Sequence, residues 1–292
     1  MIYKIVHRTT YKYKYPVSVG SHVACLKPRS VPRHRLAQSE LQVVPKPAVM
    51  VERIDYFGNH QYFFTIEEPH DELLVESRSR VIIEENPRDL NAPSPPWEDA
   101  IQGVAESLSP EALEAYQFRF ESPRIRVRPE FARYAQQSFT PRRPLVEGLL
   151  DLTTRIHHDF RFDSKVTTVR TPIEEVFRKK RGVCQDFAHI QIACLRSINL
   201  PARYVSGYLR TYPPPGQARM VGADASHAWV SAYCPGIGWI DVDPTNDVVP
   251  STGHVTIAWG RDFGDVSPLH GLILGGGAHT LKVGVDLEEV ET

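Results

Sequence analysis

The sequence predicts an α+β protein in which an all-β region comes before a group of helices and a second set of strands. The first evidence lies at the start of the chain, where polar and aromatic residues alternate with a period of two over residues 3–15. The second is a change to helical spacing after residue 97, and the third is the return of β-rich segments after residue 202. These changes of period place the helices between two β regions.

Short strand-like segments fill the first 86 residues, and turn-forming residues separate them. These segments lie at residues 41–44, 51–56, 61–66 and 73–83. Phe57, Gly58 and Asn59 indicate a hairpin turn between two of the strands. We therefore expect an all-β, sandwich-like N-terminal domain over residues 1–90.

Four prolines in the segment 86–97 disfavour both a helix interior and a sheet ladder. We place a Pro-rich linker at residues 91–96 and assign residues 97–292 to a second domain. Several of its predicted helices begin with proline, whose missing N–H costs nothing at the first helical position. The expected helices are 97–108, 110–116, 129–139, 144–160, 172–180 and 184–199, and the expected strands are 202–209, 228–234, 238–242 and 255–259.

Composition excludes several classes of partner. The 292 residues are 41% hydrophobic and 24% charged, which is typical of a folded globular protein. A formal net charge of −1 argues against a nucleic-acid surface, because such surfaces carry a marked basic excess. The start of the chain lacks the apolar run of a signal peptide, and no stretch approaches the ~18 apolar residues of a membrane span. We therefore expect a cytoplasmic protein with neither nucleic acid nor membrane as a partner.

Four cysteines occur, and their spacing fits neither a disulfide framework nor a zinc knuckle. Cys184 follows Gly182 and begins a predicted helix, where free N–H groups and the helix dipole stabilise a thiolate. Its own backbone N–H would also point at the oxyanion of an attacked carbonyl. Taken alone, Cys184 can equally be a small buried apolar residue. Cys25, Cys194 and Cys234 are interpreted as packing residues.

A histidine and an acid follow on two later strands. His227 shares one face of the strand 228–234 with Trp229, and Asp243 ends the strand 238–242. Each has an ordinary alternative, because a lone histidine is often structural and an Asp before a proline often forms a turn. Asp241 lies on the same strand face as Asp243 and is its rival. Combined with a cysteine at a helix start, however, these are the groups that nucleophilic acyl transfer needs.

The segments GVCQDFAHIQIACLRSINLPARYVSGY and SHAWVSAYCPGIGWIDVDPTN resemble the transglutaminase-like superfamily, and the resemblance covers about residues 145–265. The N-terminal β-region and the segment GRDFGDVSPLHG are similar to a bacterial subfamily. The resemblance implies a papain-like core, in which the nucleophile helix packs on an antiparallel sheet. It implies a triad of Cys184, His227 and Asp243, rather than Asp241.

The same resemblance implies a thiol-dependent enzyme that acts on peptide or protein amide bonds. It favours hydrolysis by a peptidase or amidase over cross-linking of glutamine to amines, and it implies neither a metal nor another cofactor. A noncatalytic interaction module with a vestigial site is the alternative from another class. A structural zinc site using Cys184, His227 and His189 lacks the usual ligand spacing. The sequence sets neither the natural substrate nor the oligomeric state.

The surroundings of the nucleophile leave other points open. Animal cross-linking enzymes have an aromatic residue after the nucleophile, whereas Gln185 and Asp186 follow Cys184 here. Gln185 is a candidate second oxyanion donor, and both residues are alternatively helix caps. Trp229, Tyr208 and Asp186 are the candidate cleft residues. The loop 212–220 is expected to be either a lid or a solvated turn.

Overall fold

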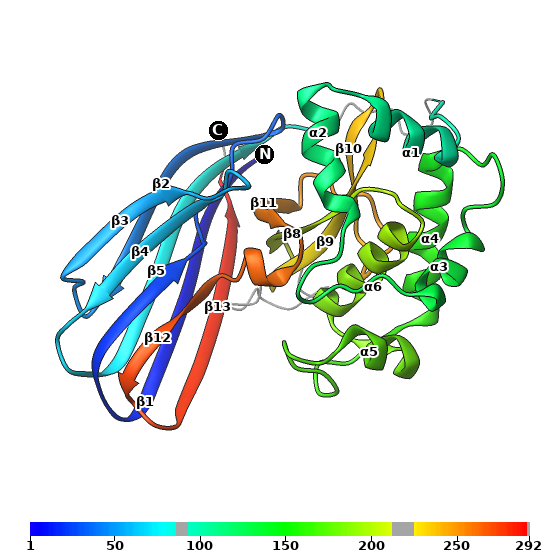
Figure 1. Ribbon diagram of the computed structural model, residues 1–292. Helices are drawn as coiled ribbons and strands as arrows, with labels where there is room; N and C mark the ends of the chain where they lie inside the picture. The colour runs from blue at the N-terminus through cyan, green and yellow to red at the C-terminus, as the bar shows by residue number, and fades with distance from the viewer. Residues whose placement is uncertain (86–92, 212–224, 291–292) are drawn as a thin grey trace, which may run out of the picture.

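The computed structural model describes residues 1–85, 93–211 and 225–290, and these form two lobes (Figure 1). The first, here called the β-lobe, is a single seven-stranded antiparallel sheet. The strand order is β2-β5-β1-β4-β3, and β12 and β13 also pair with β1. Its strands are β1 (Ile2–Ala24), β2 (His34–Val44), β3 (Val49–Ile54), β4 (His60–Ile66), β5 (His70–Ile83), β12 (Leu269–Gly275) and β13 (His279–Glu289).

The long strand β1 organises the β-lobe. Its alternating residues Tyr3, Ile5, His7 and Thr9 are all buried, as the period of two predicts. The first half of β1 pairs with β5 and β13, and its second half pairs with β4 and β12. The hairpin between β3 and β4 turns at Gly58, whose φ of +78° favours glycine. The predicted all-β region is therefore confirmed, with β1 connecting all parts of its sheet.

The end of the chain returns to the β-lobe. Strands β12 and β13 are hydrogen-bonded to β1, at the opposite end of the sequence. This corrects the assignment of all of residues 97–292 to one domain, because residues 269–289 complete the first sheet. The physical reason is that the free edge of β1 presents backbone N–H and C=O groups, and β12 and β13 pair with them. Local sequence periodicity does not report which distant strand supplies these partners.

The second, mixed lobe comprises the described residues from 93 to 268. A four-stranded antiparallel sheet has the order β10-β9-β8-β11. In Figure 1 the helices lie on one side of this sheet and the β-lobe lies on the other. The helices are α1 (Trp97–Glu106), α2 (Pro110–Tyr116), α3 (Pro129–Gln136), α4 (Leu145–Asp159), α5 (Ile173–Lys179) and α6 (Cys184–Ser197), and the strands are β8 (Ala202–Leu209), β9 (Ala225–Cys234), β10 (Gly238–Val242) and β11 (His254–Gly260). Short strands β6 (Arg161–Phe162) and β7 (Arg181–Gly182) form a separate parallel pair.

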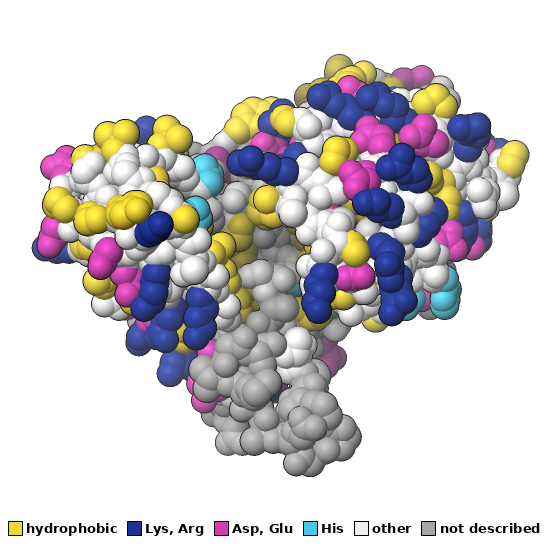
Figure 2. Space-filling view, turned by 90° about the horizontal axis from the view of Figure 1, so that it is seen from below, with side chains coloured by type: hydrophobic (Ala, Val, Ile, Leu, Met, Phe, Trp, Pro, Cys, Tyr) yellow, Lys and Arg dark blue, Asp and Glu magenta, His cyan; other side chains and the backbone are white. Residues whose placement is uncertain are grey.

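Helix α6 is the centre of the mixed lobe, as predicted. All its residues from Asp186 to Arg196 are buried, and the helix packs against β8 and β9 on one side and α3 on the other. The apolar core around α6 is continuous with residues of the β-lobe, including Tyr3 and Ile5. The two lobes therefore share one core. Figure 2 shows a hollow between them, with Lys and Arg side chains gathered on both sides.

None of the helices within the described ranges is long and apolar enough to cross a membrane.

Arg196 fixes the last turn of α6 to its surroundings. This side chain is 1% exposed and donates hydrogen bonds to the backbone carbonyls of Ala202, Arg261 and Phe120. These carbonyls belong to three segments that surround the helix end. A buried guanidinium with satisfied donors therefore joins α6 to the rest of the lobe.

Replacing Arg196 with methionine is expected to lower the free energy of unfolding by about 3 kcal/mol, because several buried carbonyls would lose their donor. The measurement is urea unfolding followed by circular dichroism. The control is Arg178→Met on the exposed surface of α5, for which we expect a change within about 0.5 kcal/mol. Equal small effects of both substitutions would contradict this role of Arg196.

Candidate active site

Cys184 is the first residue of α6, and its local structure is tightly determined. The Asp186 carboxylate accepts a hydrogen bond from the Val183 backbone N–H at 2.8 Å and another from the Thr167 hydroxyl at 2.7 Å. A Cβ at Gly182 would lie 2.5 Å from the same carboxylate, so only glycine fits there. Asp186 thus caps the helix that presents the half-buried thiol of Cys184.

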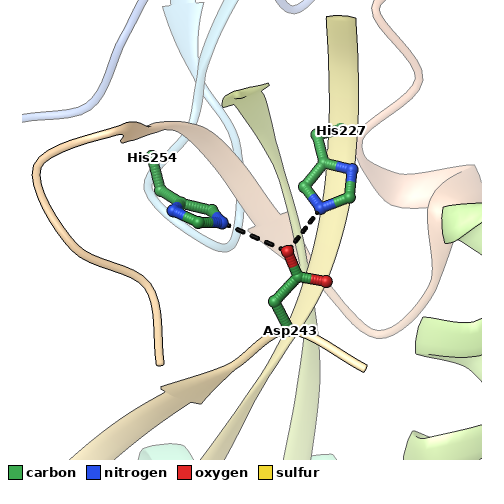
Figure 3. A group of neighbouring side chains, drawn as sticks. All are labelled: His227, Asp243 and His254. Atoms are coloured by element: carbon green, nitrogen blue, oxygen red, sulfur yellow. Dashed lines mark hydrogen bonds and ion pairs between the residues drawn. The ribbon is translucent and has the colours of Figure 1, made fainter. Parts of the chain in front are cut away.

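His227 and Asp243 meet at the ends of β9 and β10 (Figure 3). The distance from His227 Nε2 to Asp243 Oδ2 is 2.7 Å, and both residues are buried. Cys184 lies close enough to His227 to interact with its imidazole electrostatically. Because Nε2 faces Asp243, Nδ1 is the ring nitrogen available to the thiol. The structure therefore brings together the three residues that the sequence singled out, and it leaves Asp241 outside this group.

Asp243 is held by more donors than the triad requires. Its Oδ2 accepts a hydrogen bond from Asn246 Nδ2 at 2.7 Å and faces His254 Nε2 at 3.2 Å. Its Oδ1 accepts one from the Thr245 backbone N–H at 2.9 Å. Figure 3 shows His227 and His254 approaching the same carboxylate oxygen. The carboxylate is fully buried, and these donors compensate for its lost hydration.

Sequence reasoning did not find Asn246 or His254. Asn246 lies three residues after Asp243 in a turn, so its short spacing was a usable signal. His254 had none, because it begins β11, on the opposite edge of the sheet from β10.

The electrostatics of the site favour an ion pair. Burial acts to lower the pKa of His227, but the hydrogen bonds and negative charges of Asp243 and Cys184 raise it to about 10. Burial acts to raise the pKa of Asp243, but hydrogen bonds from His227 and His254 hold it well below its ordinary value. His227 is therefore an imidazolium at neutral pH and forms an ion pair with the Asp243 carboxylate.

These shifts also link the site to stability. Because the pKa of His227 is raised above the ordinary 6.5, its contribution is complete below that value and is lost as the pH rises through about 10. Asp243 has a lowered pKa, so its contribution is present above the ordinary 3.8 and is lost at lower pH. The charged pair persists between these limits.

Two candidate cleft residues prove to be buried. The hydroxyl of Tyr208 lies 2.8 Å from Nδ1 of His7 in the β-lobe, so Tyr208 connects the lobes. Trp229 is 0% exposed, and its ring centroid lies 5.3 Å from that of His254 in an edge-on arrangement. Both positions correct the expectation that these side chains line a cleft. Trp229 instead packs against the imidazole rings. It also lies against Gly207, because a Cβ added at Gly207 would be only 2.4 Å from the indole.

The remaining candidates divide in a similar way. Asp186 is buried in its capping contacts, which corrects its assignment to the cleft and agrees with the capping alternative. Gln185 is half-buried, and its part in an oxyanion site stays a prediction. The predicted lid or turn at 212–220 lies outside the described residues.

The other cysteines differ from Cys184 in being buried. Burial raises the pKa of Cys25 and Cys194 to about 12 and that of Cys234 to about 11. These three thiols therefore stay protonated at neutral pH, as packing residues do.

His227, Asp243 and His254 also place three possible metal-ligand atoms within 4.8 Å of one another. Histidine and carboxylate are suitable ligands for zinc. However, the 2.7 Å separation of His227 and Asp243 is a hydrogen-bond distance, with a proton between the two atoms. The arrangement therefore fits a hydrogen-bonded network better than a metal centre.

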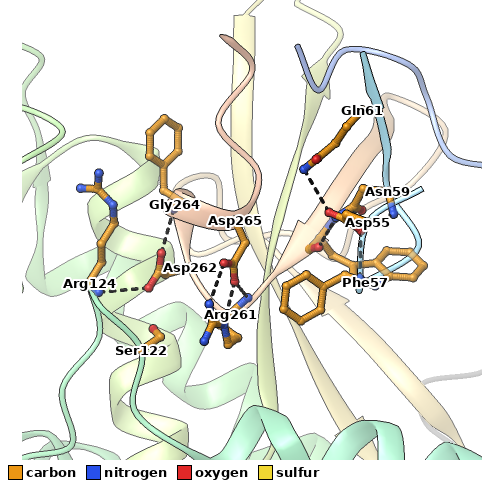
Figure 4. Close-up of polar contacts among 12 residues, drawn as sticks. Asp55, Phe57, Asn59, Gln61, Ser122, Arg124, Arg261, Asp262, Gly264 and Asp265 are labelled. Atoms are coloured by element: carbon orange, nitrogen blue, oxygen red, sulfur yellow. Dashed lines mark hydrogen bonds and ion pairs between the residues drawn. The ribbon is translucent and has the colours of Figure 1, made fainter. Parts of the chain in front are cut away.

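A second polar network connects α6 to the loop after β11. The Asp262 carboxylate accepts hydrogen bonds from the backbone N–H groups of Arg124 and Gly264, and Asp265 forms an ion pair with Arg261 (Figure 4). Nε2 of His189 on α6 accepts a hydrogen bond from the Phe263 backbone N–H at 3.1 Å. The GRDFGD segment thus fixes this loop against α6.

Comparisons with known proteins agree with this architecture. Residues 3–82 match the family model described as the bacterial transglutaminase-like N-terminal region, and residues 132–244 match the transglutaminase-like superfamily. An uncharacterized protein of Mycobacterium tuberculosis is 40% identical over 93% of this chain and 87% of its own. One of Mycobacterium leprae is 31% identical over 97% of both chains. The chain therefore belongs to the transglutaminase-like superfamily.

A solved structure shows the same fold. A protein of Cytophaga hutchinsonii, described as a "putative cysteine protease", superimposes with a TM-score of 0.75 at 21% identity. The match covers 100% of this chain and 92% of the other. The predicted α+β class with an N-terminal β-region is therefore confirmed.

Replacing His254 with alanine is expected to lower the pKa of His227 by about one unit from its value near 10. Without the donor from His254, the Asp243 carboxylate is held less firmly against His227 and stabilises the imidazolium less. A shift of one pKa unit corresponds to about 1.4 kcal/mol. Nitrogen-15 NMR of labelled histidine rings between pH 6 and 11 measures this titration without a substrate. His254→Asn restores a donor and should recover part of the shift. An unchanged titration in His254→Ala would show that His254 does not position the carboxylate.

Proposed function

We propose that this protein is a thiol-dependent acyl-transfer enzyme that acts on peptide or protein amide bonds. The observation that carries the proposal is the 2.7 Å contact of His227 with Asp243. Cys184 lies at the start of α6 and interacts electrostatically with the same imidazole. This group contains a nucleophile, a proton carrier and an orienting acid. Membership of the transglutaminase-like superfamily supports the assignment of these roles.

In the proposed first half-reaction, Cys184 Sγ attacks the carbonyl carbon of the substrate amide and forms a carbon–sulfur bond. The thiol proton passes through His227 to the leaving nitrogen as the carbon–nitrogen bond breaks. The Cys184 backbone N–H lies at the start of α6, where it can donate to the developing oxyanion. The product of this step is a thioester and a free amine.

The second half-reaction returns the thiol. Water attacks the thioester carbonyl, His227 accepts the proton of the water, and the carbon–sulfur bond breaks to give a carboxylic acid. Asp243 keeps the imidazole oriented during both steps, because its own position is fixed by Asn246 and Thr245. We propose hydrolysis as the outcome, with a peptide or protein as substrate. A cytoplasmic location stays a prediction from the sequence.

Amine transfer is the second candidate, and one specific observation favours it. A Pseudomonas aeruginosa protein named protein-glutamine gamma-glutamyltransferase is 37% identical over 76 residues, which is 26% of this chain and 11% of the other. In this alternative a primary amine replaces water and the product is a new amide. The triad chemistry is the same in both cases, so access of the second substrate decides between them.

Incubation of the protein with casein and a fluorescent primary amine separates the two reactions. We expect new peptide fragments and little fluorescence in casein, since hydrolysis is the proposed outcome. Gel electrophoresis with fluorescence and protein staining reports both products. Replacing Cys184 with alanine should lower the activity at least about 1,000-fold, because the proposed nucleophile is lost.

Cys234→Ala is the matched control, because Cys234 is a buried thiol outside the site. Activity retained by Cys184→Ala would contradict a thiol mechanism. Fluorescent casein without fragments would favour amine transfer over hydrolysis. No activity of either kind on casein or on a library of peptides would favour a noncatalytic module.

A further inference from the structure

A cavity of about 810 Å³ lies between the mixed-lobe sheet and the β-lobe. Its walls come from β8, β10 and β11, from α2, and from two segments of the β-lobe near residues 31–33 and 84–85. Cys184, His227 and Asp243 do not line it. A volume of this size is typical of small-molecule and peptide pockets.

Arg203 at the start of β8 forms part of this cavity, and its guanidinium is unusual. The residue is 6% exposed, and its guanidinium carbon lies 4.0 Å from the ring centroid of Trp239 and 3.8 Å from that of Trp259. Because indole rings stack on the guanidinium plane, only the N–H groups at the edge of this plane can donate hydrogen bonds. Nη1 reaches Glu114 at 3.4 Å, whereas the buried Nε has no partner among the described residues. A buried, unsatisfied donor of a cation is costly, which points to an absent acceptor.

The surroundings hold Arg203 rigidly in place. Trp259 is fixed from its backbone, because Asn59 donates to its carbonyl at 2.8 Å and accepts from its N–H at 3.0 Å. Figure 4 shows Asn59 beside Asp55 in the β3–β4 hairpin. Arg29 stacks on the same indole, with its guanidinium carbon 3.5 Å from the ring centroid. The edge of Arg203 is therefore a preorganised donor for a planar acceptor such as a carboxylate.

Among the residues that the structure describes, the other charges in the cavity are mainly negative. Within these residues, the cavity is lined by the carboxylates of Glu84, Glu85, Glu111, Glu114 and Asp241 and by the guanidiniums of Arg33 and Arg203. Asp241 attracts Arg203 electrostatically but forms neither a hydrogen bond nor an ion pair with a described residue. A simple anion would be repelled by these acids, and a simple cation would leave the edge of Arg203 unsatisfied. An occupant that carries both charges satisfies both sides.

We propose that this cavity binds a short zwitterionic peptide. The carboxylate of the peptide accepts hydrogen bonds from the edge of Arg203, and its ammonium group lies against Asp241 and the glutamates at the mouth. The proposal does not depend on the chemistry of Cys184. It does place a ligand beside the catalytic sheet, because Asp241 precedes Asp243 by two residues on the same strand face. His34 is electrostatically close to both Asp241 and His254, so the cavity adjoins the network around Asp243.

Isothermal titration calorimetry with glycine peptides tests the proposal, because these peptides offer only their two ends and a backbone. We expect triglycine to bind with a Kd of about 1 mM or tighter. Triglycine amide, which lacks the carboxylate, and N-acetyl-triglycine, which lacks the ammonium group, should each bind at least about tenfold more weakly. Comparing the affinities of diglycine, triglycine and tetraglycine then shows which distance between carboxylate and ammonium group the cavity prefers.

Variants assign the binding to the cavity. Asp241→Asn should reduce the difference in affinity between free and acetylated triglycine. Arg203→Met, which removes the positive charge, should make free and amidated triglycine bind equally. Because Arg203 is buried, the half-exposed Asp241 is the variant expected to fold without difficulty. Glu288→Gln, an exposed change on β13, is the matched control and should bind like the wild type.

Carbamidomethylation of Cys184 should leave triglycine affinity unchanged, which separates this cavity from the thiol site. Three outcomes would overturn the proposal. They are the absence of triglycine binding, equal affinity for the free and both capped peptides, and loss of binding after alkylation of Cys184.

Discussion

The buried contact between His227 and Asp243 is the interaction on which the rest of the site depends. A carboxylate removed from water must be compensated, and here a histidine, an amide and a backbone N–H all donate to it. The same contact keeps the imidazole positively charged. In the proposed mechanism, the orientation and charge of this ring therefore depend on the burial of an acid on another strand. The rest of the fold holds α6, β9 and β10 in fixed positions relative to one another, and these elements carry the three residues of the site.

Much of this arrangement could be predicted from local sequence. Helix α6 followed from its apolar spacing, and β8, β10 and α2 have the predicted bounds, because their patterns and turn residues are strong. The group of Cys184, His227 and Asp243 was singled out because each lies at the start or end of a predicted element. The preference for Asp243 over Asp241 came from the family resemblance, since both lie on the same strand face.

What could not be predicted depends on contacts between distant segments. The pairing of β12 and β13 with β1 joins the two ends of the chain, and periodicity carries no information about partners so far apart. His254 reaches Asp243 only because the chain crosses from one edge of the sheet to the other. Tyr208 was expected in a cleft because it lies on the strand between Cys184 and His227 in the sequence, and Trp229 because it shares a strand face with His227. In the structure, lobe packing against His7 and support of the imidazoles account for them instead.

The most direct test of the central claim is the rate of alkylation by iodoacetamide as a function of pH, with peptide mapping of the modified cysteine. We expect selective modification of Cys184 below pH 7, at least about tenfold faster than an ordinary thiol, because a helix start and a neighbouring imidazolium both favour a thiolate. Replacing His227 with alanine should remove this advantage. A Cys184 that reacts no faster than an ordinary thiol, with no effect of His227→Ala, would contradict the account.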